Sequence, residues 1–195
     1  MDSGSRGKRE GVGIDLGLSA EEKETLRQIA QAAIRSRCLK VPMTTETPAL
    51  TPKLEELRGA FVCLKEKDGQ LRGCIGMIEG RAPLHQTIRD MAVQAAFADP
   101  RFCPLEPGEL DGLQLEISVL TPLERIQDVE SIHIGTHGLC LRRGYQSGLL
   151  LPQVAVEQGW EREEFLQWTC RKAGLPAQAW KESETEIYVF SADIF

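Results

Sequence analysis

Residues 60–78, AFVCLKEKDGQLRGCIGMI, contain the pattern that decides the fold of this chain. Two segments rich in apolar residues, 60–66 and 70–78, flank Asp68-Gly69, a dipeptide that favours the tight turn of a β-hairpin. The returning segment contains Leu71-Arg72-Gly73-Cys74-Ile75-Gly76, in which a cysteine stands between two glycines. The sequence therefore predicts an antiparallel hairpin whose second strand carries a thiol.

The hexapeptide 71–76 has the composition of a functional site. Gly73 and Gly76 leave room for backbone or a ligand beside the sulfur, and glycine also adopts φ values that other residues avoid. Arg72 is a candidate to lower the pKa of the thiol or to hold an anion. Cys74 is therefore a candidate nucleophile or redox thiol. The alternative is a small side chain that only packs in a tight strand-to-helix connection.

Outside the hairpin, helices and strands alternate irregularly. Ser19 and Glu22 form a capping-box pattern before a helix that runs to about Cys38. Pro83 precedes a second helix to about Ala98, and Pro152 opens a short one. The remaining predicted elements are an amphipathic helix over 161–173 and strands over 113–120, 139–143, 149–151 and 185–191. Hairpins without regular βαβ spacing predict an α+β fold with mainly antiparallel sheet.

Length and charge limit the range of functions. A chain of 195 residues can bury a core as one domain or as two small lobes. The net charge of −6, without a basic run, argues against binding to nucleic acid or to an anionic membrane. The sequence shows neither a membrane-spanning run nor a secretory signal. We expect a soluble, cytoplasmic protein with a flexible leader over residues 1–17 and a domain over 18–195.

The cysteine pattern predicts neither a metal site nor a disulfide framework. The six cysteines lack the close spacing of zinc ligands. A chain of this length with its own core does not need disulfides, which reducing compartments remove. We expect no metal or cofactor, and small buried apolar roles for the remaining cysteines apart from Cys103: Cys38, Cys63, Cys140 and Cys170.

A catalytic cysteine would require a base. His85, in the first turn of the second helix, could fold back toward Cys74 and would stay neutral there, whereas surface exposure is the simpler interpretation. His137 lies in a glycine-flanked turn that suits either a cleft or a structural role, and His133 is expected to be exposed. Glu116 is expected to be solvated, to pair with Arg72 or to accept a proton.

Two further polar groups have structural interpretations as well as functional ones. Asp99 and Arg101, on either side of Pro100, are expected to stabilise a turn rather than to bind a ligand. Gln153 follows Pro152 and could cap a helix or hydrogen-bond a small polar substrate.

The hexapeptide 71–76 resembles the signature of the AMME-syndrome chromosomal-region candidate protein family, which is defined by the AMMECR-type domain. In prokaryotes this family is the protein A component of the AmmeMemoRadiSam system. The resemblance spans roughly residues 20–195. Further segments resemble the family in the same order: ADPRF (98–102), LEISVL (115–120), GTHGL (135–139), LLPQVA (150–155) and CRKAGL (170–175).

The resemblance implies a single domain of two interleaved subdomains. These form two unequal lobes, each built on a β-sheet, with helices flanking the larger one and a cleft between them. It also implies a genomic association with a Memo-like protein and a radical S-adenosylmethionine enzyme, and it supplies no established reaction. The residues that match the motifs become tentative site residues, catalytic for Cys74, Glu116 and His137, and ligand-binding for Arg72, Gly73, Gly76 and Gln153.

Two functional hypotheses follow. In the first, the protein is a binding or regulatory module that holds an unknown small molecule or a partner in a cleft around the hexapeptide. In the second, it is an enzyme or enzyme component in which Cys74 is a thiolate nucleophile or redox thiol and His137 or Glu116 is the proton acceptor. Its substrate is a small metabolite with a carboxylate or carbonyl. The absence of triad spacing and of an established reaction in the family favours the binding module slightly.

Overall fold

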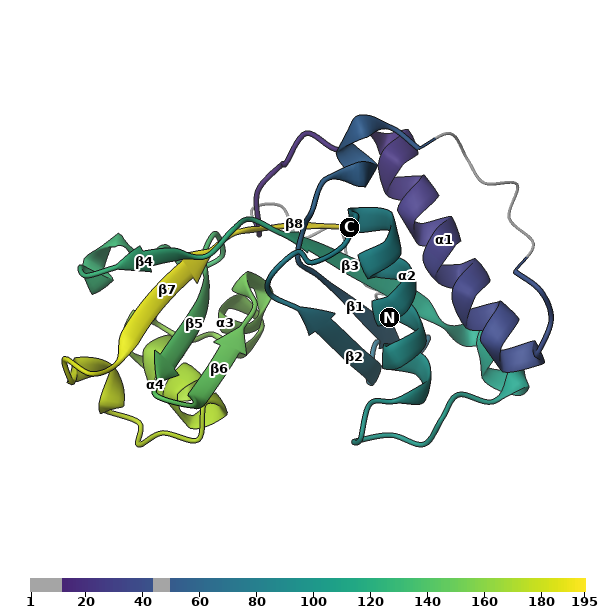
Figure 1. The fold of residues 1–195 in the computed structure, drawn as a ribbon. Helices are drawn as coiled ribbons and strands as arrows, with labels where there is room; N and C mark the ends of the chain where they lie inside the picture. The colour runs from purple at the N-terminus through teal and green to yellow at the C-terminus, as the bar shows by residue number, and fades with distance from the viewer. Residues whose placement is uncertain (1–11, 44–49) are drawn as a thin grey trace, which may run out of the picture. The chain divides into compact units, whose positions relative to one another are not determined.

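The computed structural model describes residues 12–43 and 50–195, which fold into two compact units. The larger unit comprises Asp15–Leu123 together with Asp193–Phe195. Of the described residues, the smaller unit comprises Glu124–Ala192 together with residues 12–14. The strands form two four-stranded sheets, with strand orders β2-β1-β3-β8 and β4-β7-β5-β6 (Figure 1). The predicted α+β class with antiparallel sheets is confirmed.

The predicted hairpin is the centre of the larger unit. Strand β1 (Ala60–Lys65) pairs antiparallel with β2 (Leu71–Met77) on one side and with β3 (Gln114–Leu120) on the other. Gly69 takes a φ of 87° in the turn, a value that favours glycine. Strand β8 (Ala192–Ile194) lies beside β3, where Ile117 and Phe195 exchange both backbone hydrogen bonds.

Two helices cover one face of this sheet. Helix α1 (Ala20–Leu39) starts at the predicted capping box, in which the Ser19 hydroxyl accepts from the Glu22 N–H and the Glu22 carboxylate accepts from the Ser19 N–H. Helix α2 (Leu84–Phe97) packs on β1 and β2 and runs beside α1 (Figure 1). The largest fully buried side chains of this core come from both helices, the sheet and the 3₁₀ helix Pro52–Glu55: Leu26, Leu54, Leu64, Leu84, Ile88 and Ile117.

The opposite face of the sheet carries two of the candidate site residues, Cys74 and Glu116. Side chains alternate between the two faces along a strand. Since Val62 and Leu64 face the helices, Cys63 and Lys65 face the other way. The register sets Cys74 and Glu116 opposite Cys63, one on each side. We refer to the surface formed by Cys63, Lys65, Cys74 and Glu116 as the Cys74 face.

The smaller unit repeats the principle of helices on an antiparallel sheet. Helix α4 (Arg162–Lys172) contacts β5 (Gly138–Arg143) and β6 (Gln146–Leu150), and the core of this unit is built around Phe165 and Leu166. Two strands, β4 and β8, are too short to show a sequence pattern and were not expected. The bounds of the elements in this unit are β4 Glu124–Ile126, β5 Gly138–Arg143, β6 Gln146–Leu150, α3 Pro152–Gln158, α4 Arg162–Lys172 and β7 Glu186–Phe190.

Part of the predicted leader makes backbone hydrogen bonds. Residues 1–11 lie outside the described residues. In the smaller unit, the Gly13 N–H donates to the Gly135 carbonyl at 2.7 Å and the Ile14 N–H to the Ala192 carbonyl at 2.8 Å. In the larger unit, the Leu16 N–H donates to the Asp193 carboxylate at 3.2 Å.

Across the described ranges, no helix is both long enough and apolar enough to cross a membrane.

Candidate functional site

The two glycines of the hexapeptide serve packing. A Cβ on Gly73 would lie 2.2 Å from the Ala95 carbonyl oxygen, so glycine lets α2 approach the sheet closely. A Cβ on Gly76 would lie 2.2 Å from the ring of Phe61, its cross-strand partner. Neither glycine has a positive φ. The expectation that they supply unusual backbone conformations is therefore wrong, because space is what both positions require.

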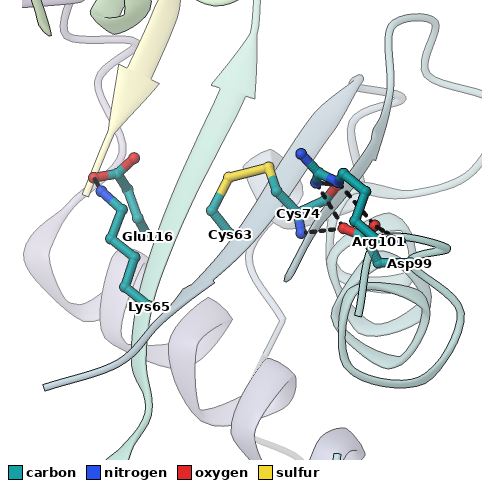
Figure 2. The surroundings of a disulfide bond; sticks show 6 residues. All are labelled: Cys63, Lys65, Cys74, Asp99, Arg101 and Glu116. Atoms are coloured by element: carbon teal, nitrogen blue, oxygen red, sulfur yellow. Dashed lines mark hydrogen bonds and ion pairs between the residues drawn. A yellow bond between two sulfur atoms is a disulfide. The ribbon is translucent and has the colours of Figure 1, made fainter. Parts of the chain in front are cut away.

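Cys74 forms a disulfide with Cys63. The two residues lie directly opposite each other on β2 and β1, with their Cα atoms 4.1 Å apart (Figure 2). The expectation that Cys63 is an unpaired packing residue, and that the chain lacks disulfides, is therefore wrong. The cause is register, since antiparallel pairing brings two cysteines from the same hairpin face to face. The Cys63 residue is 6% exposed and Cys74 is more accessible.

The segment after α2 holds the outer edge of β2 at Cys74. The Asp99 carboxylate accepts a hydrogen bond from the Cys74 N–H at 2.9 Å, and Arg101 donates to the Cys74 carbonyl at 3.4 Å (Figure 2). Arg101 also forms a forked pair with Asp99, at 2.9 and 2.7 Å. Because β2 is the last strand of its sheet, no further strand of the described chain bonds its outer edge, and this pair supplies the hydrogen bonds to the Cys74 N–H and carbonyl instead. It also stabilises the turn around Pro100, as expected, since the Arg101 N–H donates to Asp99.

The charge on Asp99 is strongly favoured. Its side chain is 2% exposed, but the hydrogen bonds from Arg101, Cys74 and the Arg101 backbone hold its pKa far below the usual range. The link from Asp99 and Arg101 to Cys74 was not anticipated from local sequence. The available signal was the ADPRF segment of the resemblance.

Glu116 pairs with Lys65 rather than with Arg72. The Lys65 ammonium lies 2.6 Å from the Glu116 carboxylate, and both side chains are about a quarter exposed, at 26% and 27%. Figure 2 shows Cys63 between this ion pair and Cys74. Cys74, Cys63 and Glu116 thus form one row across three strands, because each is opposite the next in the register.

Arg72 binds Glu109 and does not contact the Cys74 sulfur. The pairing between β1 and β2 shifts between Leu64 and Lys65, which leaves Arg72 as the extra residue of a bulge. Its guanidinium donates to both carboxylate oxygens of Glu109, at 2.6 and 3.2 Å, and to the Cys103 carbonyl at 3.0 Å. The Glu109 hydrogen bond raises the pKa of Arg72 and lowers that of Glu109. The anion that Arg72 holds in this structure is therefore Glu109.

The remaining candidates lie elsewhere. His137, which precedes β5 in the smaller unit, accepts a hydrogen bond at Nδ1 from the His133 N–H at 3.2 Å. Burial and the neighbouring His133 lower the pKa of His137, which favours the neutral ring. Gln153, in α3 of the same unit, is 6% exposed. His85 in the larger unit contacts the Leu54 carbonyl at 3.1 Å. The larger unit therefore brings together Cys74 and Glu116, while His137 and Gln153 belong to the smaller one.

Metal binding has no geometric support in the parts of the chain that are described. Across residues 12–43 and 50–195, no group of three or more His, Cys, Asp or Glu side chains is placed to hold an ion. What the Cys74 face offers chemically is a disulfide, an ion pair and an arginine at the sheet edge.

Comparison with known proteins gives a family match. The family model AMMECR1 matches residues 27–195. Protein NEQ441 of Nanoarchaeum equitans is 42% identical over 175 residues, covering 87% of this chain and 94% of that protein. A protein of Methanothermobacter thermautotrophicus is 46% identical over 186 residues, covering 91% of this chain and 95% of that protein.

A solved structure resembles the fold. The crystal structure of the uncharacterised protein PH0010 from Pyrococcus horikoshii matches with a TM-score of 0.85 and 39% sequence identity. The match covers 91% of this chain and 92% of that chain.

Proposed function

This chain belongs to the AMMECR1 family, and from that premise we propose that it is a binding module whose recognition surface is the Cys74 face with Arg101 at its edge. The ligand class that suits this surface is a small molecule with a carboxylate. The proposal concerns the larger unit. His137 and Gln153 of the smaller unit remain candidate contributors.

The observation that carries the proposal is the convergence of three family segments around the Cys63–Cys74 pair. Cys74 comes from the hexapeptide, Asp99 and Arg101 from ADPRF, and Glu116 from LEISVL. Asp99 and Arg101 contact the Cys74 backbone directly, and Glu116 lies one strand beyond Cys63 in the same row. Segments that are distant in sequence thus meet on one sheet face. Loops and edges held by a rigid scaffold are where binding groups are commonly placed.

The chemistry of Arg101 points to the ligand class. Its side chain is 51% exposed, and its Nε and Nη2 atoms are held by Asp99 and the Cys74 carbonyl. Within the described residues, Nη1 makes no hydrogen bond. A guanidinium whose orientation is already fixed loses less side-chain entropy when it binds a carboxylate, and it offers directed donors.

The test is stabilisation of the protein by small carboxylates. Succinate and citrate are the probes, and the readout is the midpoint temperature of thermal unfolding. A ligand present at 100 times its Kd stabilises by about 2.7 kcal/mol, which raises the midpoint by about 5 °C or more. We expect such a rise in the unmodified protein and its loss in Arg101→Gln, each compared with its own midpoint without ligand.

Arg89→Gln is the matched control. Arg89 is also partly exposed, at 44%, and also pairs with an aspartate, Asp90, but it lies on α2. The control should keep the full rise. The proposal is wrong if neither carboxylate stabilises the protein, or if both variants respond equally. Lys65→Gln gives a second variant if Arg101→Gln does not fold.

The second candidate function is an enzyme with Cys74 as a thiolate. The observation that favours it is that Cys74 is partly exposed, unlike its partner Cys63. A disulfide sulfur is not a nucleophile, so this function requires prior reduction. After native reduction, iodoacetamide should alkylate Cys74 faster at pH 7 than it alkylates the other cysteines. Slower alkylation than at the exposed Cys103 would rule out an activated thiolate.

A further inference from the structure

We propose that Cys63 and Cys74 form a reversible redox couple that exchanges electrons with a low-molecular-weight thiol, which attacks at Cys74. This inference concerns the disulfide alone and does not depend on carboxylate binding. It assigns a chemical partner to the pair and a different role to each sulfur.

The position of the bond argues against a purely structural role. A disulfide stabilises a fold mainly by restricting the unfolded chain, and the effect is smaller for a short loop than for a long one. Cys63 and Cys74 are only 11 positions apart in the sequence, and the two strands are already joined by the turn at 66–70. The hydrogen-bonded ladder would hold the hairpin without the bond. A link at this point constrains the unfolded chain less than one that closes a long loop would, so a structural role is not its only explanation.

The scaffold keeps the two sulfur positions adjacent after reduction. Strand β1 is paired on both sides, so Cys63 is fixed within the sheet. Strand β2 is an edge strand, but Asp99 and Arg101 hold the Cys74 N–H and carbonyl in place. With a disulfide RSSR as the oxidant, one of the two thiolates attacks it and forms a mixed disulfide with release of RS⁻. The neighbouring thiolate then attacks that mixed disulfide and releases a second RS⁻, an intramolecular step for which the effective concentration is high. Reduction is therefore readily reversed.

The difference in exposure between the two cysteines determines which sulfur an external thiolate attacks. Cys63 is 6% exposed, whereas Cys74 is partly exposed at the sheet edge. A thiolate RS⁻ therefore attacks Cys74 Sγ, the Cys63–Cys74 bond breaks, and Cys63 leaves as a thiolate that takes up a proton. A second RS⁻ attacks the R sulfur of the mixed disulfide and releases the Cys74 thiolate, which is protonated in turn. The net reaction converts one protein disulfide and two RSH into two protein thiols and RSSR, a transfer of two electrons.

Glutathione is the probe, and the reverse reaction tests the roles of the two sulfurs. The full-length native protein is first reduced, then incubated with oxidised glutathione, and each cysteine is assigned by peptide mass mapping. Unmodified protein should recover the Cys63–Cys74 link without glutathione on either residue. Cys63→Ser should accumulate glutathione on Cys74. Cys74→Ser should carry about tenfold less on Cys63, because that sulfur is buried.

Cys103 is the internal control, because it is exposed and not disulfide-bonded, so it should take up glutathione in every sample. The circular dichroism spectrum of each variant checks that it is folded. The proposal is overturned if native protein keeps both thiols while Cys103 is fully modified, or if glutathione reduces the link only after denaturation. Equal modification of Cys63 and Cys74 in the two variants would overturn the assigned direction of attack.

Discussion

Asp99 is the residue that joins the segment after α2 to the edge of β2. Its carboxylate is nearly buried, accepts from the Cys74 N–H and pairs with Arg101. Hydrogen bonds to a buried charge are worth about 1.5–3 kcal/mol each, and loss of the charge leaves the partners less well satisfied. We therefore expect Asp99→Asn to lower the free energy of unfolding by about 2–3 kcal/mol in denaturant titrations at pH 7.

Asp90→Asn provides the comparison, because Asp90 also pairs with an arginine but is 51% exposed. Asp90→Asn should lower the free energy of unfolding by at most about 0.5 kcal/mol. A similar loss of stability in both variants would contradict the role given to Asp99.

The contribution of Asp99 depends on pH in a defined direction. Its pKa is lower in the folded protein than the ordinary aspartate value of about 3.9, so the unfolded chain binds the proton more readily. The stabilisation is present above that ordinary value and is lost as pH falls below it. The stability difference between unmodified protein and Asp99→Asn should therefore shrink steadily in denaturant titrations below about pH 4. A constant difference down to about pH 2 would contradict this.

At the scale of elements, the bulge in β2 determines which residues meet. A continuous register from the pair Lys65–Leu71 would set Cys63 opposite Gly73. The shift between Leu64 and Lys65 instead sets it opposite Cys74. The hairpin was predictable because its alternation and turn are local signals. The disulfide was not, since a single extra residue in a strand leaves no clear trace in the sequence.

The other elements also divide into those that local sequence signals predict and those that only contacts within the folded chain determine. Helix α1, which Ser19 caps, and the hairpin turn at Asp68-Gly69 were predictable from capping and turn residues. Strands β4 and β8 span three residues each and are fixed by their partners in the sheets. The contacts of Asp99 with Cys74 and of Arg72 with Glu109 join residues 25 and 37 positions apart. Sequence spacing does not encode such tertiary pairs.

Gly73 tests the packing between α2 and the sheet. A methyl group there would lie 2.2 Å from the Ala95 carbonyl oxygen, which is backbone and cannot rotate away. Gly73→Ala should therefore force the helix outward and lower the free energy of unfolding by about 1–3 kcal/mol. The measurement is a denaturant titration of the two proteins.

Gly108→Ala is the control for this substitution, because nothing lies within 4 Å of the added atom. It should change stability by at most about 0.5 kcal/mol. If Gly73→Ala were equally neutral, the glycine would not be required for close packing, and its place in the motif would need another cause.

At the scale of the whole molecule, both ends of the described chain are tied to sheets. Residues 193–195 belong to the larger unit although the chain before them forms the smaller one. Gly13, Ile14 and Leu16 each donate a backbone hydrogen bond to a residue far along the chain. The segment just before α1 therefore contributes to stability through contacts that its composition does not reveal.

Two truncations measure this contribution. A chain that begins at Val12 keeps all three hydrogen bonds, whereas one that begins at Leu18 loses them. With each worth about 0.5–1.5 kcal/mol, the shorter chain should be less stable by about 2–4 kcal/mol in denaturant titrations. Equal stability of the two chains would show that residues 12–17 contribute nothing.

The central claim is that Cys74 is one half of a reversible cross-strand redox pair. Its most direct test is differential alkylation of the native protein with light iodoacetamide, followed by denaturation, reduction and heavy iodoacetamide. The account predicts heavy label on Cys63 and Cys74, and light label on Cys74 once reduced glutathione is added before the first step. Light label on both cysteines without any reductant, or heavy label on both despite native incubation with glutathione, would contradict it.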